Sequence, residues 1–176
     1  MIALTGTPVL HTARLTLRVP DLRDWEAFAA FLTSDRAALV GGPVTRERAW
    51  RSFGHLVGHW VLRGYGMFAV ALSGTEAGIG MAGPWFPESW PEQEIGWSMW
   101  SAETEGKGYA FEAAEAARTY AFAALGWPTA VSYIDPANTR SIALARRLGA
   151  VQDPAAAHPG DAPCLVFRHP RPEALA

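Results

Sequence analysis

The stretch that decides the fold is EIGWSMWSAETEGKGYAFEA, residues 94–113. Its first seven residues predict a strand, Gly106 and Gly108 predict a tight turn, and the Ala-rich segment from Tyr109 to Leu125 predicts a helix. A strand, a glycine-rich turn and a helix N-terminus in this order can bind a phosphate, because glycines let the backbone approach it and the first helical amides lack partners. Lys107 adds a positive charge there. We therefore expect a phosphate-bearing ligand, with an ordinary strand-to-helix turn as the alternative.

Hydrophobic periodicity predicts further elements on both sides of this stretch. Before it we expect a strand, two helices that begin after Asp21 and Thr45, and an antiparallel hairpin, at residues 14–19, 22–32, 46–63 and 66–85. After it we expect a buried strand, a helix capped by Asn138 and ended by Gly149, and a final strand, at residues 130–134, 139–148 and 164–168. This order predicts an α+β, or mixed α/β, fold with a largely antiparallel first half.

Length and composition favour a single domain over residues 1–176, since the chain has 176 residues of which 49% are apolar. The net charge of −2 is spread along the chain without like-charge runs, so no nucleic-acid partner and no membrane partner is expected. Cys164 is the only cysteine, which excludes an intramolecular disulfide and a cysteine metal cluster. The N-terminal residues lack the pattern of a signal peptide, so we expect a cytoplasmic protein.

Aromatic residues gather just before the decisive stretch. Trp85 and Trp90 lie in a segment stiffened by prolines, and Trp97 and Trp100 follow in the predicted strand. The segment is either a lid over a binding site or a partner surface, and we favour the lid. Trp85, Trp90 and Trp97 are therefore candidate walls of a pocket for an apolar or cationic substrate, with core packing as the alternative.

Three motifs together resemble the GCN5-related N-acetyltransferase family. They are Glu94-Ile95-Gly96-Trp97, the turn Glu105–Ala110 with Glu112-Ala113, and Asn138-Thr139-Arg140-Ser141 with Leu148-Gly149. Within this family the chain is most similar to the group that includes the ribosomal-protein N-terminal acetyltransferases, which are bacterial. The resemblance covers residues 12–168. It implies a central, mostly antiparallel sheet that is splayed between two strands and flanked by about four helices.

The resemblance also implies how acetyl-CoA binds. Backbone amides from Glu105 through Gly106, Lys107, Gly108, Tyr109 and Ala110 would hold the pyrophosphate, and the pantetheine arm would enter between the splayed strands at residues 94–100 and 130–134. A strand amide of Trp97, Ser98 or Met99 would polarise the thioester carbonyl. Asn138 matches the asparagine that contacts pantetheine, and Ser141 lies where this group places a residue near the thiolate.

Two positions depart from the family's pattern. Glu103 stands where a Gln or Arg usually begins the turn motif, and Ala145 stands where many members have a Tyr as general acid. Ser141 is the remaining candidate, as a hydrogen-bond donor to the leaving thiolate. For the base we select Glu94, a carboxylate near several tryptophans that could act through water, with a solvated strand-end carboxylate as the alternative.

Other polar and aromatic residues have ordinary interpretations. His55 and His59 share a helix face, and we expect a solvated edge and no metal site. Trp25, Trp50 and Trp60 have the spacing of core residues. Glu112, Glu115 and Arg118 are expected to form one polar stripe on the central helix.

These observations predict an acetyl-CoA-dependent N-acetyltransferase that acts on a primary amine, either a protein N-terminus or a small molecule. The amine would attack directly in a ternary complex, because Cys164 lies far from the motif and offers no acyl-enzyme route. The protein would act as a monomer or homodimer. The alternative is a catalytically silent acyl-CoA-binding sensor or assembly module, supported only by the missing Tyr.

Overall fold

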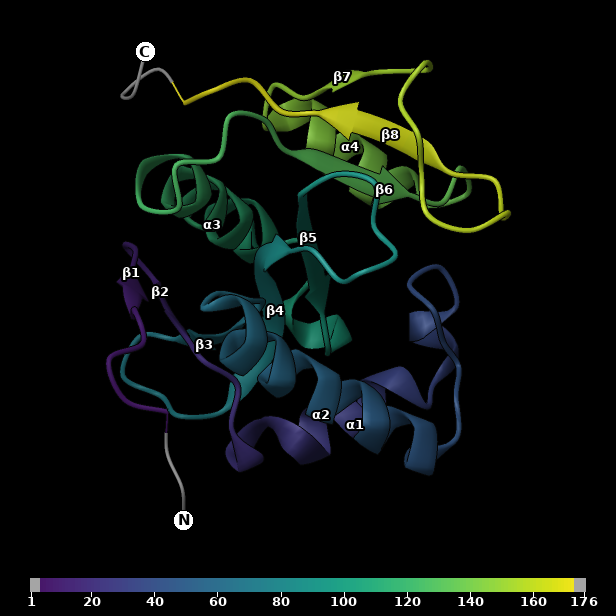
Figure 1. The fold of residues 1–176 in the computed structure, drawn as a ribbon. Helices are drawn as coiled ribbons and strands as arrows, with labels where there is room; N and C mark the ends of the chain where they lie inside the picture. Colours follow the sequence, from purple (N-terminus) through teal and green to yellow (C-terminus); the bar gives the residue numbers. More distant parts are fainter. Residues whose placement is uncertain (1–3, 173–176) are drawn as a thin grey trace.

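A mixed sheet of eight strands with helices on both faces forms the structure, a computed structural model that describes residues 4–172 (Figure 1). The strand order is β1-β2-β3-β4-β5-β6-β8-β7. The strands are β1 Leu10–His11, β2 Leu15–Arg18, β3 Phe68–Leu72, β4 Gly78–Trp85, β5 Glu94–Met99, β6 Val131–Ile134, β7 Val151–Gln152 and β8 Leu165–Arg168. The α-helices are α1 Trp25–Leu32, α2 Arg46–Arg63, α3 Tyr109–Ala123 and α4 Thr139–Arg147, and short 3-10 turns lie at Leu22–Asp24, Asp35–Ala37 and Ala102–Thr104.

Alternation along β3 explains the layers. Phe68 and Val70 pack with the alanines of α3 on one face, whereas Ala69 packs with α1 and α2 on the other. Helix α4 lies on the α3 side, where the Arg147 guanidinium sits 4.0 Å above the Phe111 ring. The apolar side chains of both faces are thus covered by helices, as a two-faced sheet requires.

The parallel pairing of β5 with β6 is the feature that shapes the site. Every other strand pair in the sheet is antiparallel, and β5 and β6 pair only at Glu94 opposite Val131. One residue further, the Ser132 hydroxyl donates to the Ile95 carbonyl over 2.6 Å, so a side chain takes the place of a ladder bond. Beyond it the two strands separate, which leaves backbone groups of β5 facing a gap.

The predicted fold class is confirmed: the sheet is mostly antiparallel, it splays between β5 and β6, and four α-helices flank it. The predicted caps are also present, since the Thr45 side chain accepts from the Arg48 amide and the Asn138 side chain accepts from the Ser141 amide. The sequence did not predict β1, β7 or the turn Asp35–Ala37, which are too short to show a hydrophobic period.

Two expectations about packing were wrong. Trp50 keeps 52% of its surface exposed and lies edge-on to Trp25 at 4.8 Å, so it caps the α1–α2 pair from outside the core. Arg118 does not belong to a solvated stripe, because it is only 8% exposed and its Nη1 donates to the Leu148 carbonyl at the end of α4. The aliphatic part of an arginine side chain packs well in a core when its guanidinium donates a hydrogen bond to a carbonyl.

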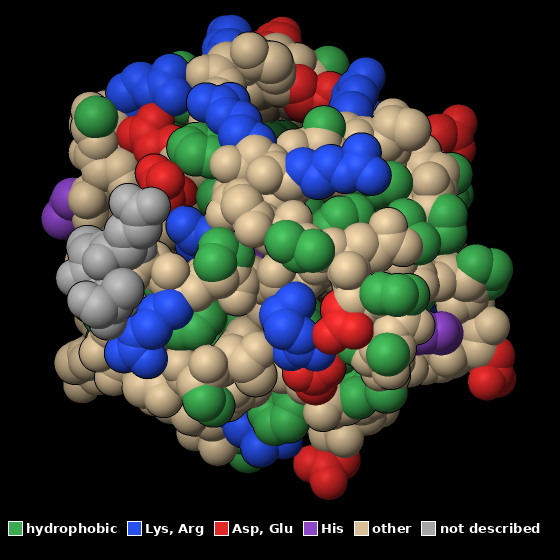
Figure 2. Space-filling view, turned by 90° about the horizontal axis from the view of Figure 1, so that it is seen from above, with side chains coloured by type: hydrophobic (Ala, Val, Ile, Leu, Met, Phe, Trp, Pro, Cys, Tyr) green, Lys and Arg blue, Asp and Glu red, His purple; other side chains and the backbone are tan. Residues whose placement is uncertain are grey.

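Charges are interspersed on the face that Figure 2 shows, the upper end of the view in Figure 1, where basic, acidic and apolar side chains alternate. A single-sign patch of the kind that binds nucleic acid is not seen on that face. Over the described residues no helix combines the length and the apolar character needed to cross a membrane.

The start of α1 is fixed by a buried ion pair. Asp24 has no exposed surface, and its carboxylate accepts from both terminal nitrogens of Arg18 on β2, at 2.8 and 2.9 Å, and from the Asp21 amide. Arg18 also donates to the Glu76 carbonyl in the turn before β4. The pair therefore ties α1, one wall of the site described below, to the sheet.

Replacing Asp24 by Ala should lower the free energy of unfolding by about 3–5 kcal/mol, because the mostly buried Arg18 guanidinium loses its bidentate partner and keeps only the longer contact with Asp21. The exposed pair of Arg46 with Glu26 provides the control, and Glu26→Ala should cost less than about 1 kcal/mol. Urea unfolding measures both. Equal losses in the two variants would contradict the anchoring role of Asp24.

Candidate active site

Two hollows meet at β5. An inner cavity of about 520 Å³ lies between α1 and α2 on one side and β4, β5 and β6 on the other. An open cleft of about 970 Å³ lies between the turn at residues 104–111 and α4. Both are lined by Trp97, Ser98, Asn138 and Ser141, so the two hollows join beside the gap between β5 and β6.

The glycine-rich turn lines the cleft as expected. Gly106 and Gly108 have φ values of +70° and +82°, which a side chain makes costly, and Gly108 is the N-cap of α3. The amides that follow begin α3 and face a cleft lined by Tyr109 and Ala110. The cleft therefore has the backbone donors and helix dipole that favour an anion.

The positive charge at the cleft differs from the prediction. Lys107 does not line it; its side chain is exposed, and its carbonyl accepts from Arg14 Nη1 at 2.9 Å. The basic residues that do line the cleft come from outside the glycine-rich turn: Arg36, Arg140 and Arg147. The positive φ at Gly106 and Gly108 bends the turn so that its backbone, not the lysine side chain, faces the cleft.

Glu105 connects the two sides of this cleft. One carboxylate oxygen accepts from Arg36 and the other from Arg140, each at 2.5 Å. Arg36 lies in the turn after α1, whereas Arg140 begins α4. The Glu105 side chain thus balances two of the three arginines. Its backbone amide already donates to the Ala102 carbonyl at 3.2 Å, so among the expected amides this one is not free for a phosphate.

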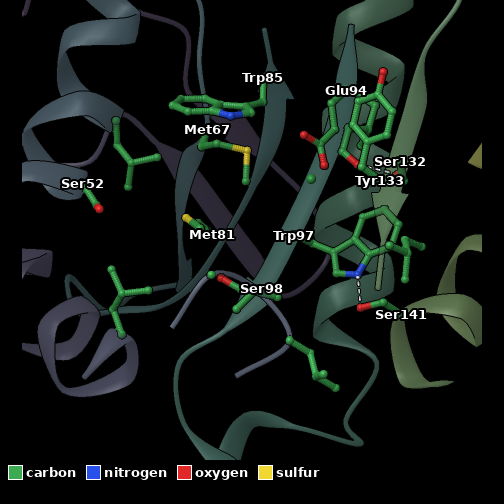
Figure 3. Close-up of a pocket in the computed structure, with 18 of the residues that line it drawn as sticks. Ser52, Met67, Met81, Trp85, Glu94, Trp97, Ser98, Ser132, Tyr133 and Ser141 are labelled. Atoms are coloured by element: carbon green, nitrogen blue, oxygen red, sulfur yellow. Dashed lines mark hydrogen bonds between the residues drawn. The ribbon is translucent and has the colours of Figure 1, made fainter. Parts of the chain in front are cut away.

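Asn138 and Ser141 lie where the first turn of α4 meets both hollows. Asn138 Oδ1 accepts from the Ser141 amide at 3.1 Å, so the cap fixes the serine. Trp97 Nε1 donates to Ser141 Oγ at 3.3 Å, shown as a dashed line in Figure 3. Because the oxygen accepts this bond, the hydroxyl proton is free to point elsewhere. Ala145 has no exposed surface, so even a Tyr at this position would need the core to rearrange.

The Glu94 carboxylate points into the inner cavity between Trp85 and Tyr133 (Figure 3). Its Oε2 accepts from Trp90 Nε1 at 2.5 Å. Burial among aromatic rings raises the pKa of Glu94 to about 7, although the Trp90 indole and the Tyr133 backbone act in the opposite direction. A pKa near neutrality is the value that suits a proton acceptor at physiological pH.

Tyr133 stands next to Glu94 and was not predicted. Its hydroxyl accepts from the Glu92 amide at 3.2 Å and points away from Ser141 (Figure 3). Burial raises the pKa of Tyr133 to about 12, so the phenol stays protonated. It forms a neutral wall of the cavity and does not replace the Tyr that is missing at position 145.

The walls of the inner cavity are mostly apolar. The expected Trp85, Trp90 and Trp97 line it, which agrees with the segment at residues 85–91 lying over the site. The sequence missed five further walls, which α1, α2, β4 and the residue before β3 supply: Phe28, Phe31, Leu56, Met67 and Met81. These residues had the spacing of core residues, and periodicity does not separate a core side chain from a cavity wall.

His59 is a buried connector and not a solvated edge. It is 2% exposed, its Nδ1 lies 2.7 Å from the Tyr65 carbonyl, and its Nε2 accepts from the Phe86 amide. The ring stacks on Trp85 at 4.4 Å, and burial lowers the pKa of His59. The neutral ring therefore holds the end of β4 against α2. Within residues 4–172 no three His, Cys, Asp or Glu side chains gather as metal ligands.

A second histidine, His169, forms a pair that could be mistaken for a nucleophile with its base. Its Nε2 lies 2.8 Å from Ser132 Oγ. The Ser132 proton already goes to the Ile95 carbonyl, so His169 donates to the serine. Burial, together with Arg118, lowers the pKa of His169 to about 3, far too low for a general base. The pair serves to bridge the strands where they separate.

Residues 14–151 match the family model described as an acetyltransferase (GNAT) domain. Since this match covers most of the chain, the protein belongs to the GCN5-related N-acetyltransferase family. It is therefore an acyltransferase, and acetyl-CoA is the acetyl donor that this family uses.

Solved structures agree with this assignment. The chain is 38% identical to an acetyltransferase from Agrobacterium tumefaciens, with 97% of this chain and 99% of the other covered at a TM-score of 0.89. A GNAT-family acetyltransferase from Bacillus anthracis is 24% identical, with coverages of 92% and 96% and a TM-score of 0.72. RimL, a ribosomal L7/L12 alpha-N-protein acetyltransferase solved with coenzyme A, is 16% identical, with coverages of 93% and 98% and a TM-score of 0.73. At these identities the last two structures support the fold alone.

Gly106→Val should weaken coenzyme A binding at least about 10-fold, because a side chain on the turn blocks the backbone from charged phosphate oxygens. Gly126→Val is the matched control: its φ is +67° against +70° at Gly106, neither position has an atom within 4 Å of an added Cβ, and Gly126 lies at the far end of α3. Both variants should lose similar stability. Titration calorimetry compares them, and equal affinity in the two variants would contradict the placement of the coenzyme.

Proposed function

We propose that the protein transfers the acetyl group of acetyl-CoA to a primary amine by direct attack in a ternary complex. The observation that carries this proposal is the position of Glu94. Its carboxylate, with a pKa near 7, lines a cavity that opens beside Ser141 into a cleft suited to an anion. A base for the amine and a donor for the leaving thiolate would then act from two walls of one space.

Groups left unpaired in the cleft fit the coenzyme. The Ser98 hydroxyl is buried without a hydrogen-bond partner and lines both hollows. The Gln93 and Ile95 carbonyls face β6, so by strand alternation the Trp97 amide faces the widening gap. These groups could bind the pantetheine amides and the thioester oxygen. Such bonds would also satisfy the buried polar groups of the protein, which otherwise lack hydrogen-bond partners. Bound acetyl-CoA supplies the acetyl group in activated, thioester form.

Glu94 would accept the proton that the ammonium must lose. An aliphatic amine is protonated at neutral pH, and a carboxylate with a pKa near 7 accepts a proton far better than one at its usual value of 4.5. The proton could pass through water, which the cavity is large enough to hold. Trp90 Nε1 donates to Oε2 and so holds the carboxylate in place.

Ser141 would donate its hydroxyl proton to the leaving sulfur. Trp97 acts through it as a positioning residue, because the indole N–H occupies the serine oxygen and directs the proton away from itself. The high pKa of a hydroxyl suits a hydrogen-bond donor better than a full acid. With Ser141 in this role, the absence of a tyrosine at position 145 is compatible with turnover, which favours the enzyme over the silent-module alternative.

Glu94→Gln should lower kcat about 10- to 1000-fold while the affinity for coenzyme A holds, because the variant keeps the shape and loses the base. For the wild type, kcat/KM for the amine should rise with pH through a midpoint near 7, and the variant should lack this limb. Release of free thiol from acetyl-CoA measures both. An unchanged limb in the variant would place the base elsewhere.

Glu92→Gln serves as the matched control, because Glu92 lies two residues away, pairs with Arg168 and does not line the cavity. It should keep the limb.

Stability gives a separate check on Glu94. Its folded pKa lies above the value of 4.5, so its cost to stability appears as pH rises through about 4.5 to 7. Glu94→Gln should therefore be more stable than the wild type by about 1–3 kcal/mol at pH 8 and equally stable at pH 4.

A further inference from the structure

We infer that the acceptor is a primary amine on an apolar, aromatic-sized body that bears neither a second amine nor a carboxylate beside the first. The inference rests on the proposed function and narrows its substrate class. It follows from which side chains line the inner cavity and from a space beside Glu94 that Gly96 leaves open. Two kinds of molecule carry such an amine: a free arylalkylamine and a peptide whose first residue is aromatic. The experiment below distinguishes them.

Among the residues that the structure describes, neither lysine nor arginine lines the cavity to pair with an anion on the substrate. Of the described residues that line it, Glu94 and His55 are the only ones with an acidic or imidazole side chain. Basic side chains line the adjoining cleft instead, where Glu105 already pairs with Arg36 and Arg140. A free amino acid would thus bring its carboxylate into an apolar space that also holds Glu94.

A second ammonium would find no partner either. Glu94 is the only carboxylate among the cavity-lining residues that the structure describes. Polyamines and aminoglycosides carry several ammonium groups, and each further group would lose its water without gaining a counter-charge. A single carboxylate surrounded by aromatic side chains suits a ligand with a single ammonium group. The faces of the aromatic rings also attract that positive charge.

The remaining walls suit an apolar body. Phe28, Leu56, Met67, Met81 and Trp85 line the space, and in Figure 3 both methionines point into it below Trp85. Thioether side chains adapt to the shape of an aromatic ring and make favourable contacts with its edge. A volume of about 520 Å³ leaves room for such a body next to the reacting amine.

Gly96 sets the entrance to that space. It lies two residues from Glu94 on the same face of β5. A Cβ at this position would lie 3.6 Å from Glu94 Oε1 and 3.3 Å from Met67 Cε. The missing side chain therefore leaves open the region between the base and the apolar wall, through which the body attached to the amine must pass.

A panel of amines tests the inference by thiol release from acetyl-CoA at pH 8.5, where a histidine side chain is ordinarily uncharged. We expect turnover of 2-phenylethylamine and of phenylalaninamide, and a kcat/KM for phenylalanine at least about 100-fold below that of its amide. The kcat/KM values for spermidine and kanamycin should be no higher than the value for phenylalanine. A higher kcat/KM for Phe-Ala-Ala amide than for 2-phenylethylamine would identify the peptide source, and the reverse order the free amine.

The panel separates failure of the inference from failure of the proposed function. Preferred turnover of phenylalanine, spermidine or kanamycin would overturn the inference and leave acetyl transfer to amines intact. Binding of coenzyme A without thiol release for any amine would overturn the proposed function, and the inference with it.

Gly96→Ala tests the space itself. It should raise KM for 2-phenylethylamine at least about 10-fold and leave KM for acetyl-CoA unchanged, since the added methyl narrows the amine side alone. Gly58→Ala is the matched control, because Gly58 lies on α2 with no atom within 4 Å of an added Cβ, and it should change neither constant. An unchanged amine KM in a folded Gly96→Ala variant would overturn the placement.

Discussion

The separation of β5 from β6 is the constraint on which the rest of the site depends. The two strands pair at Glu94 and Val131, and Ser132 supplies one further bond to Ile95 before the gap opens. A continuous ladder would satisfy the backbone of β5 and close the route between the cleft and the inner cavity. The splay instead leaves the backbone of β5 unpaired at the gap, and the Trp97 indole packs beside it against the apolar cluster of Ile134, Ala145, Ala150 and Phe167.

This geometry also explains why the acidic group sits where it does. Glu94 is placed at the last paired position, so a rigid strand holds its carboxylate at the mouth of the splay. The aromatic surroundings that raise its pKa would destabilise the fold above neutral pH, and Trp90 offsets part of that cost. Residues selected for chemistry often reduce stability in this way. The cap at Asn138 positions Ser141 at the junction by ordinary helix-start geometry.

Much of the fold was predictable because strand alternation and helix caps are local signals. The turn at Gly106 and Gly108 and the cap at Asn138 were predictable for the same reason, because their roles depend on the backbone conformation of neighbouring residues in the sequence. The roles of the cleft arginines and of the further cavity walls were not predictable, since these residues reach the glycine-rich turn and β5 only through tertiary packing. Glu94 shows both sides: its type and position indicated a base, whereas its raised pKa depends on rings brought from other elements.

Direct attack requires that both substrates occupy the joined hollows at once, and initial-rate kinetics test this most directly. Rates are measured over a grid of acetyl-CoA and amine concentrations, with any amine that turns over. The shared walls at Trp97, Ser98 and Ser141 predict reciprocal plots that intersect, the pattern of a ternary complex. Parallel lines, together with an acetylated enzyme isolated in the absence of amine, would contradict the account, because they require a covalent ping-pong route.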